Sequence, residues 1–128
     1  MNPFITHAAW TLVVAFTLSI VYELYRSTVK AGVSKHDSTR VFVREGIPFY
    51  LIAAVVIGLL FTGAQWAPWV GLFYCIALIL VSIFYYNPTV MLDRKPGLVD
   101  WFEDLVYTGL LFVAAAMLIY AVSGRTLA

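Results

Sequence analysis

The chain has 128 residues, of which 62% are hydrophobic and only 12% are charged, and its formal net charge is +1. A soluble domain carries roughly 25% charged residues, so this composition excludes water as the main solvent. We expect no nucleic-acid partner for so apolar and nearly neutral a chain.

Four apolar runs of about 16 to 18 residues follow one another, each roughly 24 to 27 Å long as a helix, close to the thickness of a bilayer core. A soluble bundle would need a polar stripe on every helix, and these runs have none. The sequence therefore predicts an all-α integral membrane protein, with four transmembrane helices in an up-down bundle that forms a single domain over residues 1–128. The expected helices cover roughly residues 8–30, 40–62, 68–86 and 98–122.

The first two predicted helices have recognisable ends. Helix-compatible residues continue beyond the first apolar run as far as Gly32, and Asp37 or Ser38 can cap the next helix. Pro48 lacks a backbone N–H, so we expect a kink or a restart near Gly46, with a short interfacial turn before the membrane part.

The third helix is expected to start with Pro68 in its first turn and to end at Asn87-Pro88. Pro96 and Gly97 then break the chain before the fourth helix. The first turns of that helix carry apolar residues at i, i+3, i+4 and i+7 and acidic residues on the other face, which predicts an amphipathic, interfacial lead-in. The apolar residues are Leu98, Trp101, Phe102 and Leu105, and the acidic ones are Asp100, Glu103 and Asp104.

Charge is distributed on one side of the predicted membrane. Seven of the eight basic residues lie between the first and second apolar runs or between the third and fourth, and the eighth is Arg125. All seven acidic residues fall on the same side, six of them in these two links and Glu23 near the inner end of the first run. By the positive-inside rule both charged loops are cytoplasmic, and both termini lie on the non-cytoplasmic side. We expect the membrane to be a prokaryotic plasma (inner) membrane.

Candidate cofactor ligands are few. His7 and His36 fall on opposite sides of the predicted membrane, so they cannot clamp one haem iron between them. With one cysteine besides, the chain also lacks ligands for an intramembrane metal site. We therefore predict no cofactor, no metal and no catalytic residue.

Glu23 is the one carboxylate expected near the inner end of a transmembrane helix, and Arg26 is one turn away. An interfacial i,i+3 pair of these residues is the simplest interpretation, and a polar coupling site is the alternative. This separates the chain from the small multidrug-resistance transporters, which share its size and helix count but carry their essential Glu in mid-helix.

The segment from Asp93 to Asp104 carries two basic and four acidic residues, and the segment from Glu23 to Glu45 carries five basic and three acidic. Because the two segments are complementary, we predict an ion-pair or docking collar, within the chain or between subunits. Its members would be Arg40 and Arg44 facing Asp100, Glu103 and Asp104. A magnesium site on the three carboxylates, as in a lipid-modifying enzyme, is a further alternative.

These observations predict a small accessory subunit of a larger membrane complex, such as a respiratory, photosynthetic or membrane oxygenase assembly, and not an enzyme in itself. Its expected partners are membrane lipids and other integral-membrane subunits, which could approach closely at Gly58, Gly71 or Gly109. The alternative is a homo-oligomeric transporter or channel for a small solute.

Overall fold

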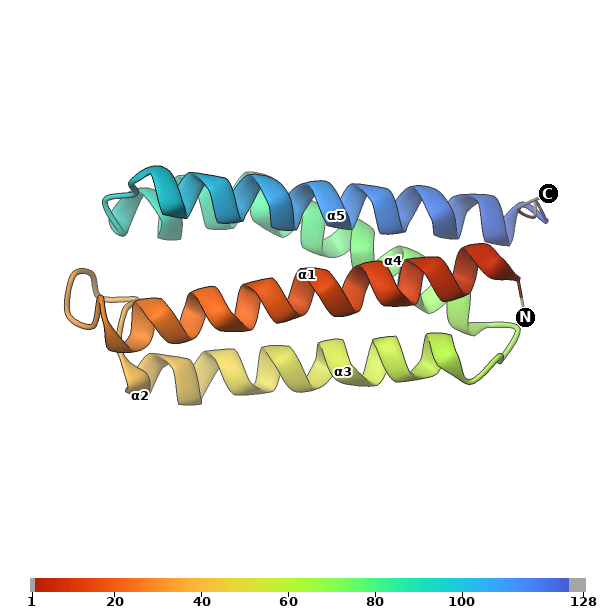
Figure 1. The fold of residues 1–128 in the computed structure, drawn as a ribbon, viewed down its shortest axis with the longest axis horizontal. Coiled ribbons are helices and arrows are strands. Elements are labelled where there is room, and N and C mark those ends of the chain that lie inside the picture. The colour runs from red at the N-terminus through yellow and green to blue at the C-terminus, as the bar shows by residue number, and fades with distance from the viewer. Residues whose placement is uncertain (1, 125–128) are drawn as a thin grey trace.

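Four helical segments run up and down along a common direction in the computed structural model, which describes residues 2–124 (Figure 1). No strand occurs in that range, and Arg125 lies outside it. Each segment is long and apolar enough to cross a membrane. The chain is therefore an all-helical protein compatible with four membrane spans, as its sequence predicts.

Helix α1 covers Pro3–Thr28 and starts five residues earlier than expected. The side chain of Asn2 accepts a hydrogen bond from the backbone N–H of Phe4 at 2.8 Å, and Pro3 occupies the first turn, where its missing N–H costs nothing. The loop after α1 contains Gly32 with φ +88°, a conformation that favours glycine.

The second segment consists of α2 (Thr39–Val41), a π-helical turn η1 (Phe42–Gly46) and α3 (Ile47–Phe61). The hydroxyl of Ser38 caps it by accepting from the N–H of Val41 at 3.1 Å. Pro48 lies in the first turn of α3. The predicted irregularity near Gly46 is this π turn, after which the α-helix starts again.

The third segment consists of α4 (Ala67–Val81) and a second π-helical stretch, η2 (Ser82–Met91). The predicted end at Asn87-Pro88 is wrong, because the helix continues through Pro88. In an α-helix the proline ring would clash with the carbonyl one turn earlier, and the wider π turn moves that carbonyl away.

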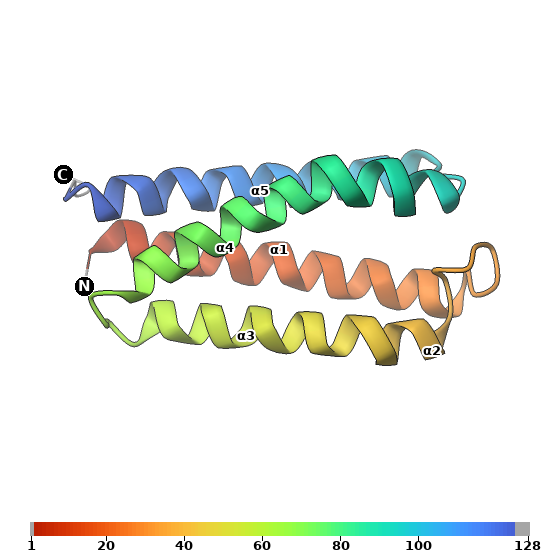
Figure 2. The same ribbon diagram turned by 180° about the vertical axis from the view of Figure 1, so that it is seen from behind.

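The fourth segment is α5 (Leu98–Val122), with the bounds expected from the sequence. It packs along α1. Figure 2, the view from behind, shows the third segment crossing in front of both helices, from the level of α3, where α4 begins, to the level of α5. The third segment thus diverges from α3 toward the end of the bundle that carries α2. We call this end, with the loops 29–38 and 92–97, the charged end.

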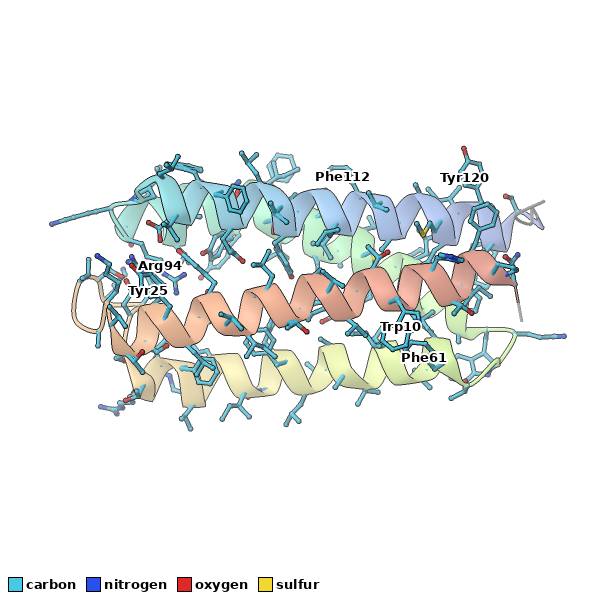
Figure 3. The ribbon with its side chains drawn as sticks, viewed as in Figure 1. Trp10, Tyr25, Phe61, Arg94, Phe112 and Tyr120 are labelled. Carbon is cyan, nitrogen blue, oxygen red and sulfur yellow. The ribbon has the colours of Figure 1, made fainter. Side chains whose placement is uncertain are left out.

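The core is apolar and lies mainly in the half away from the charged end, where side chains from all four segments are fully buried. It includes Leu12, Leu60, Cys75, Leu111 and Leu118. In the same half, the rings of Trp10 and Phe61 join α1 to α3 with centroids 5.3 Å apart (Figure 3). Large apolar residues such as Phe84 and Phe112 are exposed, as expected of a surface that meets lipid chains.

Candidate functional site

The charged end is held by two buried arginines, and the first is Arg26 in the last turn of α1. Its Nε donates to Asp37 Oδ1 at 3.1 Å and its Nη2 donates to the carbonyl of Arg94 at 3.1 Å. Its Nη1 donates to Asp100 Oδ1 at 3.4 Å. Arg26 therefore joins α1 to both loops and to the start of α5.

The second buried arginine is Arg94, in the loop before α5 (Figure 3). Its Nη1 and Nη2 donate to the two carboxylate oxygens of Glu23 at 3.0 and 2.8 Å, a two-pronged geometry that arginine favours. Nη1 also donates to the hydroxyl of Tyr86 at 2.9 Å, and Nε lies 3.1 Å from Asp37 Oδ1. Burial acts to lower the pKa of Arg94, but the hydrogen bond and the charge of Glu23 outweigh it and raise that pKa above its usual value.

Asp37 is fully buried although it lies in a loop. Besides the two arginines, the hydroxyl of Ser34 donates to Asp37 Oδ2 at 2.7 Å. A buried carboxylate is tolerated when such partners replace its water. Asp37 therefore fastens the loop 29–38 onto the end of α1 and onto the loop 92–97.

Asp100 caps α5 and completes this network. Its Oδ2 accepts from the backbone N–H of Gly97 at 2.8 Å, and its Oδ1 accepts from the hydroxyl of Tyr22 and from Arg26. The position is favourable, since the N-terminus of a helix attracts negative charge.

The acidic face of α5 points inward. Asp100, Glu103 and Asp104 are 6%, 7% and 5% exposed, whereas the apolar residues of the same turns are largely exposed. The apolar residues therefore face outward, and the carboxyl groups face the bundle. This is the reverse of a helix lying on water.

A cavity of about 310 Å³ lies at the charged end, where η2 diverges from α3. One wall comes from η1 and α3 and the other from η2 and α5, with α1 behind. Its mouth lies at Glu45 and Tyr85, since both side chains are more than half exposed. The polar residues that line it are Ser19, Glu23, Ser27, His36, Glu45, Tyr50, Ser82, Tyr85, Tyr86, Arg94, Glu103, Asp104 and Tyr107.

Glu103 is the exceptional group of this cavity. Within residues 2–124 it has neither a hydrogen bond nor an ion pair, although it is only 7% exposed. The neighbouring Asp104 has the side chain of Asn87 beside it. An unpaired carboxyl is expensive to bury, and in membrane bundles such groups mark solute or ion paths.

The predicted ion-pair partners are not the ones found. Arg44 lies 3.4 Å from its neighbour Glu45, both of them well exposed, and Arg40 is exposed without an ion pair in the described range. Both arginines belong to the outer surface of α2 and η1, away from the acidic face of α5. The two charged segments do meet, but through Arg26 and Arg94.

The predicted i,i+3 pair of Glu23 and Arg26 is also wrong. Glu23 pairs with Arg94, and Arg26 pairs with Asp37 and Asp100. The close packing of α1 on α5 brings Asp100 within reach of Arg26, and the loop before α5 brings Arg94 to Glu23. Contacts between segments thus replace the contact along one helix.

Sequence reasoning missed Asp37, Arg94 and the tyrosines that surround them. A signal was available in α5: in lipid, the stripe containing Phe102 must face outward, which forces Glu103 and Asp104 into the bundle. Their buried partners could then be sought among the basic residues of both loops.

The residues described contain no group of three or more His, Cys, Asp or Glu side chains arranged to hold a metal ion. His7 Nδ1 lies 2.7 Å from the carbonyl of Pro3, and His36 Nε2 lies 3.2 Å from Asp93 at the other end of the bundle. In the comparisons with known proteins, no protein-family model, no curated protein and no solved structure matches this chain.

Proposed function

We propose that the protein is a small integral membrane carrier whose cavity at the charged end binds a small solute during its passage across the bilayer. The observation that supports this most directly is Glu103, a buried carboxyl with no partner in residues 2–124 that lines a cavity of about 310 Å³. A purely structural bundle gains nothing from such a group, whereas a solute site does.

The distribution of packing favours a carrier over an open channel. The cavity occupies the charged end, and the other half of the bundle is filled by buried apolar residues such as Leu12 and Leu118. A solute would thus have access from one side only. Carriers need such a state, which alternates with one open to the opposite side.

Both π-helical segments line the cavity, η1 through Phe42 and η2 through Tyr86. π-Helical turns occur frequently at functional sites, where the altered helix register re-aims side chains. They also interrupt the regular hydrogen bonding of two helices beside the cavity, and so offer places where the bundle can bend.

We place the charged end in the cytoplasm of a prokaryotic plasma membrane. Support comes from the seven basic residues in the two loops and neighbouring helix ends at this end. Sided labelling of Ser34→Cys and Gly63→Cys in a Cys75→Ala background tests the orientation: a membrane-impermeant maleimide added to intact cells should label position 63 and not position 34.

An accessory subunit of a larger membrane complex is the second candidate. It is favoured by a shallow apolar hollow on the outer face of α1, where a helix of another subunit could pack. The hollow is lined by Val13, Val14, Thr17, Leu18 and Val21. Purification from native membranes in a mild detergent tests it, since stoichiometric neighbours would support the subunit and a monodisperse chain without partners would contradict it.

Flux into proteoliposomes tests the carrier. Radiolabelled choline, alanine, glycerol and acetate would be compared, and we expect at least one to enter faster than into empty liposomes. Ser82→Phe fills the cavity and should abolish that flux, whereas Thr17→Phe lies on the exposed face of α1 and should not. If no solute enters faster than into empty liposomes, the carrier proposal is wrong.

A further inference from the structure

We propose that the ligand of the charged-end cavity is a small organic monocation, an ammonium group with apolar substituents, with Glu103 as its counter-charge. This inference names the class of solute that the proposed carrier would transport, and in that sense it rests on the proposed function. The binding itself can be measured without any transport.

The first argument is the charge of the lining. Four carboxyl groups line the cavity, from Glu23, Glu45, Glu103 and Asp104, and a single guanidinium, that of Arg94. Arg94 is already occupied by Glu23, by Tyr86 and by the nearby Asp37. The lining therefore carries more carboxyl groups than basic ones, and its other basic side chain, His36, lies against Asp93, so no basic side chain of the lining pairs directly with Glu103.

The second argument is that Glu103 itself lacks a partner. It is more than nine-tenths buried, it lines the cavity, and in the described part of the chain nothing pairs with it or donates to it. A buried carboxylate needs a cation and hydrogen-bond donors to replace its water. A positively charged ligand in the cavity supplies that partner.

The third argument concerns the chemistry of the walls. Phe42, Phe49, Tyr50 and Tyr107 line the cavity, and the ring centroid of Tyr50 lies 6.2 Å from that of Phe42 and 5.1 Å from that of Phe49. Aromatic faces attract alkylated ammonium groups, which a strongly hydrated metal cation does not match. No metal-binding group of side chains occurs among residues 2–124, so the walls favour an organic cation.

The fourth argument is size. A volume of about 310 Å³ is at the lower end of the range for ligand pockets, about 300 to 1,000 Å³. Such a space suits a compact amine. The same ammonium chemistry is found in free amines and in the headgroups of choline and ethanolamine lipids, and the mouth at Glu45 and Tyr85 lies at the end of the bundle where either source is available.

The test is calorimetric titration of the full chain in a neutral maltoside detergent with choline. The matched neutral probe is its carbon isostere, in which a quaternary carbon replaces the nitrogen. We expect choline to bind, and we expect the isostere to bind at least about thirtyfold more weakly. A loss of this size is usual when one partner of a buried charge pair is removed. Equal affinity for both probes would overturn the proposal.

Glu103→Gln keeps the shape of the side chain and removes its charge, and should weaken choline binding about thirtyfold or more. Asp93→Asn, an exposed carboxylate outside the lining, should leave it unchanged. Thermal unfolding of Glu103→Gln at or above the wild-type temperature would show that the variant is folded. Unchanged choline affinity in that folded variant would also overturn the proposal.

Native mass spectrometry separates the two sources. Ethanolamine lipid retained by the wild type and lost from Glu103→Gln identifies a headgroup ligand, and binding of free choline without retained lipid identifies a free amine. If choline does not bind but a neutral solute crosses proteoliposomes, the cation inference fails and the carrier remains. If choline binds and no solute crosses, the carrier fails and the cation site remains.

Discussion

Arg94 holds Glu23 by two parallel hydrogen bonds, from Nη1 to Oε1 at 3.0 Å and from Nη2 to Oε2 at 2.8 Å, across 71 positions of sequence. The pair closes the bundle at the charged end, because it fastens the loop before α5 to the last turns of α1. Asp37 lies on the other side of the guanidinium, and both members of the pair line the cavity.

Breaking this pair should destabilise the fold strongly. Arg94→Met leaves the partly buried carboxylate of Glu23 without its cation and the fully buried carboxylate of Asp37 with Arg26 alone, and we expect a loss of about 3 kcal/mol in the free energy of unfolding. Adding Glu23→Gln to Arg94→Met should recover part of that loss, because it removes one uncompensated charge. Denaturant unfolding in micelles measures both, and a double variant as unstable as the sum of the singles would contradict this pairing.

The exposed pair of Arg44 and Glu45 supplies the contrast. Both side chains are 62% exposed, so water already solvates each charge. Arg44→Ala should change the free energy of unfolding by less than about 0.5 kcal/mol, as should Arg40→Ala. A loss comparable to that of Arg94→Met would show that the originally predicted collar, not the buried network, holds this end together.

Asp37→Asn should loosen the loop 29–38 in particular. The amide cannot compensate two guanidinium groups, so Arg26 and Arg94 lose charge pairing on the side facing that loop. We expect trypsin to cut at Lys30 and Lys35 several-fold faster in the variant, while the amides of α4 keep their hydrogen-exchange protection. Equal cleavage of the variant and the wild type would mean that Asp37 does not fasten the loop.

Gly71 is the glycine at which helices of this chain approach closely. A Cβ there would lie 2.9 Å from Leu60 Cδ2 and 3.2 Å from Leu118 Cδ1, so Gly71→Ala should cost about 1 to 3 kcal/mol of stability. Gly58→Ala is the matched control, because nothing lies within 4 Å of its Cβ position, and alanine there should be neutral or stabilising. Equal effects at both sites would contradict this packing.

The four helices were predictable because the apolar runs are long and lack polar stripes. The starts of α2 and α5 follow from Ser38 and from Pro96-Gly97, which act locally. The predicted start of α1 is five residues too late, because the cap at Asn2 and Pro3 lies before the apolar run that locates the helix. The continuation through Pro88 was not predictable in the same way, because proline usually ends a helix and a π-helical register is set by the packing around it.

The candidate site was predictable only in its composition. The sequence indicates that two segments of opposite charge lie at one end, and Arg26 and Asp100 belong to the network found there. The pairing of these charges depends on the packing of α1 on α5 and on the position of the loop that carries Arg94. These contacts join residues more than 70 positions apart in the sequence. The inward direction of Glu103 follows from lipid as the solvent, which reverses the usual interpretation of an amphipathic helix.

The measurement that tests the account most directly is choline uptake into proteoliposomes that contain the wild type, Glu103→Gln or Asp93→Asn at equal protein density. The account predicts uptake above that of empty liposomes for the wild type and for Asp93→Asn, and uptake at the level of empty liposomes for Glu103→Gln. Uptake that is equal for the wild type and Glu103→Gln, or absent from all three, would contradict a carrier that works through the inward carboxyl of α5.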